Sequence, residues 1–208
     1  MSSHTRSITA LLAAAVLSAC TGAARGAAQT SPPVGVGLAA GDSAWTQADV
    51  EFMSSMIGHH AQAVEMARLA PERAQSESVK TLAARIISAQ VDEIATMQQW
   101  LRDRGQPVPE PHPTSHGMHE MMPGMLTPEQ FAQLEAARGP EFDRLFLTLM
   151  IQHHRGAVAM VERLFGSYGA GQDEAVFKFA SDVNVDQATE IARMQRMLAD
   201  LLFGSPSP

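Results

Sequence analysis

Residues 56–66 read MIGHHAQAVEM, and residues 150–160 read MIQHHRGAVAM. Seven of the eleven positions are identical, including both histidines and the methionine at each end. On a helix with about 3.6 residues per turn, His59 and His60 fall on the apolar face, whereas Gln62 falls on the polar face. A buried imidazole costs free energy unless it is hydrogen-bonded or binds a metal. The repeated pair therefore predicts one interior site built from both copies.

A second pair of segments is repeated downstream of the histidine motifs. Residues 90–101 read QVDEIATMQQWL and residues 187–198 read QATEIARMQRML, with seven of twelve positions identical. The inward positions of both segments carry Gln, Glu and Met at helical spacing. Ala- and Met-rich amphipathic helices resemble one another to some extent without duplication. Matched His-His, Gln and Glu at inward positions nevertheless favour a duplicated helix pair.

Capping and helix-breaking residues delimit four long helices. A Ser, Thr or Asp at the N-cap opens a helix, and Gly or Pro ends one. These signals predict long helices over residues 46–69, 76–104, 141–165 and 173–202, with Pro128 opening a short helix. Two copies of a long antiparallel pair most simply form an all-α four-helix bundle. The bundle is predicted over residues 46–203, divided into repeat one (46–105), a loop (106–127) and repeat two (128–203).

The first 45 residues predict export. Arg6 precedes a short apolar run, and Leu17-Ser18-Ala19-Cys20 resembles a bacterial lipobox, in which the cysteine is lipidated. We therefore expect a lipoprotein signal peptide over residues 1–19 with lipidation at Cys20, although a plain secretory leader is the alternative. Residues 20–45, rich in Ala, Gly, Pro and Ser, predict a flexible tether. The protein should be exported and lipid-anchored to the cell envelope, facing the periplasm or the cell exterior.

Composition narrows the range of partners. A formal net charge of −7 disfavours nucleic acid, whose phosphates need a basic surface. No apolar run is long enough to cross a bilayer, so membrane contact is expected through the lipid alone. Cys20 is the only cysteine, so thioethers and imidazoles are left as the metal ligands of the folded part; the full chain has thirteen methionines and eight histidines. We expect a metal ion as the partner, and a metal-exchange partner or a homo-oligomer stays open.

The bundle interior offers imidazole, thioether and carboxylate ligands together. Thioethers with imidazoles suit Cu(I), which we favour, whereas imidazoles alone also suit zinc or another divalent metal. A metal-free core network of His, Gln and Glu is the alternative. The glutamates are expected as ligands or as acceptors that orient an imidazole. The predicted interior metal residues are His59, His60, His153, His154, Met56, Met66, Met150, Met160, Glu93, Glu190, Met97 and Met194.

The central loop carries a second, independent metal signal. Short His-rich tracts commonly bind metals, and a segment broken by Pro and Gly has no apolar stripe in which to bury methionine. We therefore predict a flexible copper-binding arm, with an ordinary solvated linker as the alternative. Its candidate ligands are His112, His116, Met118, His119, Met121, Met122 and Met125.

The sequence lacks the motifs of several enzyme classes. Ferritin-type di-iron sites use Glu-x-x-His, which does not occur in the chain. The chain also lacks a Gly-x-Ser-x-Gly elbow, a Walker loop and a His-Glu-x-x-His zinc protease motif. The sequence therefore assigns no catalytic residue.

The repeated Met-Ile-x-His-His-x-x-Ala-Val-x-Met, followed by Gln-x-x-Glu-Ile-x-x-Met, resembles the domain-of-unknown-function family 305. The resemblance covers residues 47–202 and implies a ferritin-like four-helix bundle, usually exported. Some members are periplasmic copper-binding proteins linked to copper resistance. By resemblance, their motif residues correspond to Met56, His59, His60 and Met66 and to the equivalent positions of the second copy.

These observations favour an exported, lipid-anchored protein that sequesters or transfers Cu(I) through His and Met ligands, in metal homeostasis or resistance, without catalysis. A metal-dependent oxidoreductase on the same bundle is one alternative. The other is a metal-free envelope interaction module.

Overall fold

A computed structural model describes residues 45–111 and 122–204 of the chain. The predicted signal peptide, Cys20, nearly all of the tether, and His112, His116, Met118, His119 and Met121 lie outside the described residues. Within the described ranges the chain forms six helices: α1 (Gln47–Arg68), α2 (Ala70–Arg73), α3 (Glu77–Asp103), α4 (Pro128–Ala136), α5 (Gly139–Gly166) and α6 (Glu174–Phe203). The predicted all-α class is confirmed.

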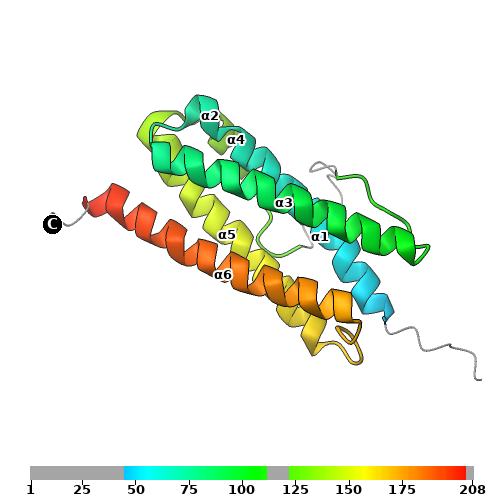
Figure 1. Cartoon of the computed structure of the whole chain (residues 1–208). Coiled ribbons are helices and arrows are strands. Elements are labelled where there is room, and N and C mark those ends of the chain that lie inside the picture. The colour runs from blue at the N-terminus through cyan, green and yellow to red at the C-terminus, as the bar shows by residue number, and fades with distance from the viewer. Residues whose placement is uncertain (1–44, 112–121, 205–208) are drawn as a thin grey trace, which may run out of the picture. The chain divides into compact units, whose positions relative to one another are not determined.

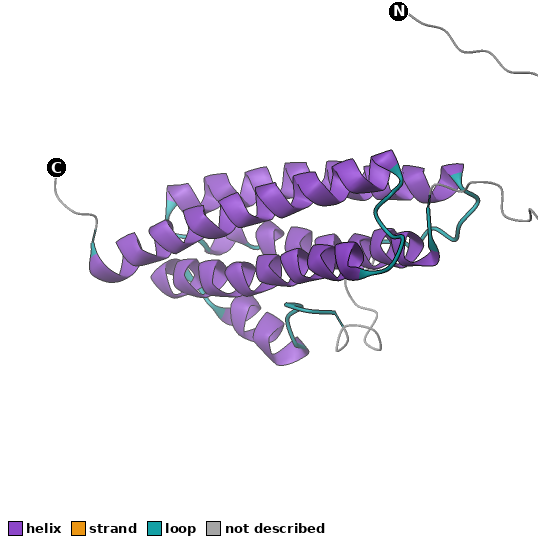
Figure 2. Cartoon of the chain, turned by 90° about the horizontal axis from the view of Figure 1, so that it is seen from below, coloured by secondary structure: helices purple, strands orange, loops and turns teal. Residues whose placement is uncertain are grey.

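The four long helices form two hairpins that pack against each other. Helix α1 packs along α3, α5 packs along α6, and the two hairpins meet mainly through α1 and α5. Figure 1 shows that α1 and α5 run in opposite directions, as the two halves of a pseudo-two-fold arrangement should. Figure 2 shows the long helices lying lengthwise beside one another. None of the described helices is long and apolar enough to cross a bilayer.

Local capping explains where the helices begin. Thr46 and Thr127 form capping boxes with Asp49 and Gln130, and the side chains of Ser76 and Asp173 also accept backbone hydrogen bonds at their helix starts. Helix α1 ends at Arg68, close to the expected residue 69, and Pro71 lies in the first turn of the short helix α2 that follows. Helix α5 begins at Gly139 instead of the expected residue 141. Proline is compatible with a first helical turn, where its missing N–H has no intrahelical partner.

The apolar core is divided into two clusters. One contains Met56, Met97 and Met160, and the other contains Met66, Met150 and Met194. The four motif histidines belong to the buried polar residues and occupy positions along α1 and α5 between these clusters. The core is therefore interrupted by a polar layer at its middle.

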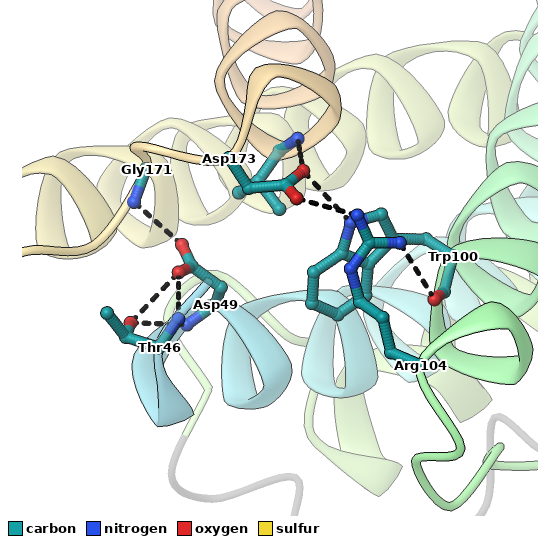
Figure 3. A network of polar contacts seen from close by, with 7 residues as sticks. Thr46, Asp49, Trp100, Arg104, Gly171 and Asp173 are labelled. Carbon is teal, nitrogen blue, oxygen red and sulfur yellow. Dashed lines mark hydrogen bonds and ion pairs between the residues drawn. The ribbon is translucent and has the colours of Figure 1, made fainter. Parts of the chain in front are cut away.

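Two buried aspartates tie each half of the chain to the other. The Asp49 carboxylate accepts a hydrogen bond of 2.7 Å from the Gly171 backbone N–H, beside its capping bonds to Thr46 (Figure 3). Asp143, the equivalent residue of the second half, accepts hydrogen bonds from the backbone N–H groups of Gln75 and Ser76 at 3.2 and 2.9 Å. Each half thus caps the interhelical turn of the other.

Asp173 holds a third polar contact at the Asp49 end of the bundle. Its carboxylate accepts hydrogen bonds from Arg104 at 2.6 Å and from the Trp100 indole N–H at 3.2 Å (Figure 3). Arg104 also stacks over Trp100, with its guanidinium carbon 4.3 Å from the ring centroid. Burial alone would raise the pKa of Asp173, but the hydrogen bonds from Arg104, Val176 and Trp100 and the Arg104 charge together lower it. The α3 end is thereby fixed to the start of α6.

Candidate metal centre

The centre of the bundle is a pair of imidazoles from the two halves. The rings of His59 on α1 and His153 on α5 have their centroids 3.9 Å apart and planes inclined by 41°. Their exposed fractions are 0% and 1%. The antiparallel contact between α1 and α5 brings these equivalent positions together near the pseudo-two-fold axis. The structure thus places the repeated histidines in one shared interior location.

The other histidine of each motif faces a glutamate of its own half. The Nε2 atom of His60 lies 2.7 Å from the Glu93 carboxylate, and Nε2 of His154 lies 2.7 Å from the Glu190 carboxylate. The His154 contact meets hydrogen-bond geometry, whereas the His60 contact is equally short but poorly aligned. A carboxylate in this position orients an imidazole and raises its basicity as a metal ligand.

Several buried polar atoms of this layer lack a hydrogen-bond partner within the described part of the chain. They are Nδ1 of His60 and His154, both amide atoms of Gln90 and the amide oxygen of Gln187. Neither ring nitrogen of His153 meets hydrogen-bond geometry, although the His59 backbone lies close to it. An unsatisfied buried polar group costs about 1–3 kcal/mol. Such a concentration of unsatisfied donors and acceptors is typical of a site that binds a polar ligand or an ion.

The protonation state of His153 favours coordination. Burial, and next the neighbouring rings of His59, His154 and His60, hold the pKa of His153 well below the ordinary histidine value. The ring is therefore neutral at physiological pH, with a lone pair available to a metal.

Buried methionines lie one turn from each histidine–glutamate pair. Because α1 and α3 are antiparallel and His60 contacts Glu93, residues four before His60 and four after Glu93 share a level. These residues are Met56 and Met97, both with exposed fractions of 0% and both in the same cluster. The same register in the second half pairs Met150 with Met194, which are also fully buried and lie in the other cluster. Met66 and Met160 are buried farther from the histidine layer.

The described residues contain no group of three or more His, Cys, Asp or Glu side chains arranged to hold a metal ion. The borderline and hard ligands occur as pairs: His59 with His153, His60 with Glu93, and His154 with Glu190. Among the described residues, the other side chains near these pairs that carry donor atoms are buried methionines and glutamines. Thioethers are donors for soft ions, and imidazoles suit soft and borderline ions.

A connecting segment, residues 122–127, crosses the histidine layer on the α1–α5 side. The Pro123 carbonyl lies 3.1 Å from Nε2 of His59. Gln62 exchanges two hydrogen bonds with the backbone of Leu126, and the Gln152 amide reaches the carbonyls of Gly124 and Met125 at 3.4 Å. We call this segment the strap.

The strap corrects two expectations from the sequence. Met125 is only 7% exposed and Met122 packs against the core, so these two members of the predicted arm are attached to the bundle. Gln62 was expected on the polar face but is 4% exposed, because the strap covers it and pairs with its amide. The pairing spans 64 residues, and no local pattern could have predicted it.

Comparison with known proteins identifies relatives with the same architecture. The family described as domain of unknown function (DUF305) matches residues 49–198. A DUF305 fragment from Deinococcus radiodurans is 34% identical, with a TM-score of 0.65 over 74% of this chain and 97% of its own. A DUF305 protein from Streptomyces coelicolor is 29% identical, with a TM-score of 0.65 over 77% of this chain and 98% of its own. No curated protein matches the chain.

A third similar structure is that of CopM in a Cu(I)-bound form. It is 29% identical, with a TM-score of 0.58 over 77% of this chain and 99% of its own. CopM is also described in Cu(II)-bound and Ag-bound forms.

Proposed function

The chain belongs to the DUF305 family, and on that premise we propose that it binds copper, favouring Cu(I), in the histidine layer of its bundle. The observation that carries this proposal is the burial of four imidazoles together, led by the His59–His153 contact at 3.9 Å. The similarity to CopM, which is described with Cu(I), Cu(II) and Ag bound, supports the choice of metal.

The donor set supports a soft metal cargo. His59, His60, His153 and His154 supply nitrogen, and Met56, Met97, Met150 and Met194 supply sulfur within one turn of it. Glu93 and Glu190 orient the outer imidazoles. Met66 and Met160 lie about two turns from the layer, which makes them more distant candidates.

We propose further that the protein is exported and attached to the envelope through lipid on Cys20. The lipobox-like Leu17-Ser18-Ala19-Cys20 supports this proposal. His112, His116, Met118, His119 and Met121 are proposed to capture copper before it enters the bundle, with Met122 assisting where the strap begins. The role is sequestration or transfer in metal homeostasis, without turnover.

Thermal unfolding with and without Cu(I) tests the proposal. A ligand that binds only the native state stabilises it by about 2.7 kcal/mol at a hundredfold excess of free ligand over Kd. We expect Cu(I), supplied anaerobically in a competing chelator, to raise the melting temperature of the mature protein. Replacing the four motif histidines together should abolish this rise. A melting temperature that Cu(I) leaves unchanged in the parent protein would refute the copper-binding function.

A further inference from the structure

The buried outer histidines are linked to solvent through their glutamates. His60 and His154 have side-chain exposures of 0%, whereas Glu93 and Glu190 are exposed by 19% and 24%. Each carboxylate therefore has one side in water and an oxygen 2.7 Å from a buried ring nitrogen. A cation approaching from this side would meet a carboxylate before it met an imidazole.

Helix α6 extends this acidic surface outward from Glu190. Asp182, Asp186 and Glu190 follow one another at intervals of four residues, which places them in one row along the helix. Asp182, at the outer end of the row, forms an ion pair with Lys178 on the same helix. Burial, and next the charges of Glu93, Asp182 and Glu190, raise the pKa of Asp186. Glu93 belongs to α3, so Asp186 lies near enough to the glutamate of the other half for the two charges to interact.

Duplication does not account for the acidic row. At the offset that relates Glu190 to Glu93, the counterparts of Asp182 and Asp186 are Arg85 and Ala89. The first half thus carries no equivalent carboxylates beyond Glu93. The row is a feature of the second half alone.

Unsatisfied buried amides lie about one helical turn from the carboxylates. Gln90 and Gln187 each precede a glutamate by one helical turn and are exposed by only 2% and 3%. Both amide atoms of Gln90 and the amide oxygen of Gln187 have no hydrogen-bond partner in the described structure. Buried amides without partners, one turn from partly exposed carboxylates, indicate a polar or ionic occupant.

We propose that the α3–α6 side of the bundle is the entry route for the metal cation, with Asp186 attracting it and Glu93 and Glu190 passing it to His60 and His154. This inference rests on the proposed copper-binding function and assigns a role to Asp186, which lies outside the ligand set. Negative charge beside an entry point raises the association rate of a cation, and salt weakens this effect. Asp186 therefore controls the rate of loading, whereas the interior ligands set its capacity.

Stopped-flow mixing with Ag(I) tests the entry route. The protein used in this experiment has serine substituted for His112, His116, Met118, His119 and Met121. Ag(I) binding then measures the sites of the bundle and not these residues. Tryptophan fluorescence provides the signal, since Trp100 lies in the same core cluster as Met97 and Trp45 packs against that cluster. The variants are Asp186→Asn and Asp186→Lys. The matched controls are Asp92→Asn and Asp92→Lys, which alter an exposed charge one position before Glu93 and therefore on a different face of α3.

Asp186→Asn should slow association about two- to tenfold at low ionic strength, and Asp186→Lys should slow it further. Added salt should reduce these differences, and the amount of Ag(I) bound at equilibrium should stay unchanged. The Asp92 variants should load at the parent rate. Equal rates for the Asp186 and Asp92 variants would overturn the entry route. Failure of the parent chain to bind Ag(I) at all would instead refute the proposed function of the bundle.

Discussion

The His59–His153 contact leads to a prediction about the stability of the metal-free protein. His153 is fully buried against the His59 ring, and neither of its ring nitrogens makes a well-formed hydrogen bond. Replacing an unsatisfied buried polar group by an apolar one of similar size is nearly neutral or stabilising. A residue retained despite this cost is more typical of a binding site than of a structural core.

We expect His153→Leu to leave the free energy of unfolding of the metal-free protein unchanged or to raise it by up to about 2 kcal/mol. The same change should weaken Cu(I) or Ag(I) binding at least about tenfold, which corresponds to about 1.4 kcal/mol. Urea unfolding with and without metal measures both effects. Strong destabilisation with unchanged metal affinity would show that His153 serves the fold instead.

The lowered pKa of His153 also predicts the pH dependence of stability. Below pH about 6.5 this histidine takes up a proton in the unfolded chain but not in the native protein. The unfolded state then binds more protons, so stability falls with decreasing pH between that value and the lower native pKa. The contribution of His153 should approach about 1.4 kcal/mol per pH unit. Urea unfolding between pH 7.5 and 5.5 should show it, and the slope should be smaller in His153→Leu; equal slopes would contradict the assignment.

At the scale of the helices, Gly156 is the position that lets the strap lie over the histidine layer. A Cβ atom at Gly156 would be 1.9 Å from the Pro123 carbonyl oxygen, whereas one at Gly58 would meet nothing closer than 3.9 Å. Both glycines lie inside long helices, next to a histidine motif. The two positions therefore form a matched pair for measuring what the strap contributes.

Gly58→Ala should stabilise the protein by about 0.5–1 kcal/mol, because alanine favours the helix interior. Gly156→Ala carries the same propensity gain but forces the strap away, so it should be net destabilising. It should also increase the rate of hydrogen exchange at the Leu126 backbone N–H, which donates a hydrogen bond of 2.8 Å to the side-chain oxygen of Gln62. Equal stabilisation by both substitutions would mean that the strap does not rest on Gly156.

Helix boundaries were the most predictable feature at this scale. The four long helices begin within two residues of the expected positions 46, 76, 141 and 173. At three of these starts a side chain, that of Thr46, Ser76 or Asp173, forms the cap, which is a local interaction. The strap was not predictable, because Gln62 and Gly156 contact it through residues far away in the chain. The sequence placed Met125 in a flexible arm, whereas the structure shows it buried. Its burial was not predictable for the same reason, because it depends on the strap and not on the neighbours of Met125 in sequence.

At the scale of the whole molecule, duplication explains why a single pattern predicted both the fold and its centre. Equivalent residues make equivalent contacts: His60 with Glu93 and His154 with Glu190, or Asp49 and Asp143 with the turns of the opposite halves. The sequence predicted that the motif histidines would converge, and His59 and His153 do, whereas His60 and His154 each contact a glutamate of their own half. The sequence did not distinguish the central His59–His153 pair from the two outer histidine–glutamate pairs. This division depends on how α1 and α5 cross, which the sequence does not specify.

The central claim is that copper is held by the imidazoles of the bundle. Anaerobic Cu(I) titration against a competing chelator tests it most directly, using chains in which His112, His116, Met118, His119 and Met121 are replaced by serine. We predict that this chain still removes Cu(I) from the chelator, and that replacing His59, His60, His153 and His154 as well abolishes the binding while circular dichroism shows an intact helical bundle. Undiminished Cu(I) binding by the chain without these four histidines would contradict the account.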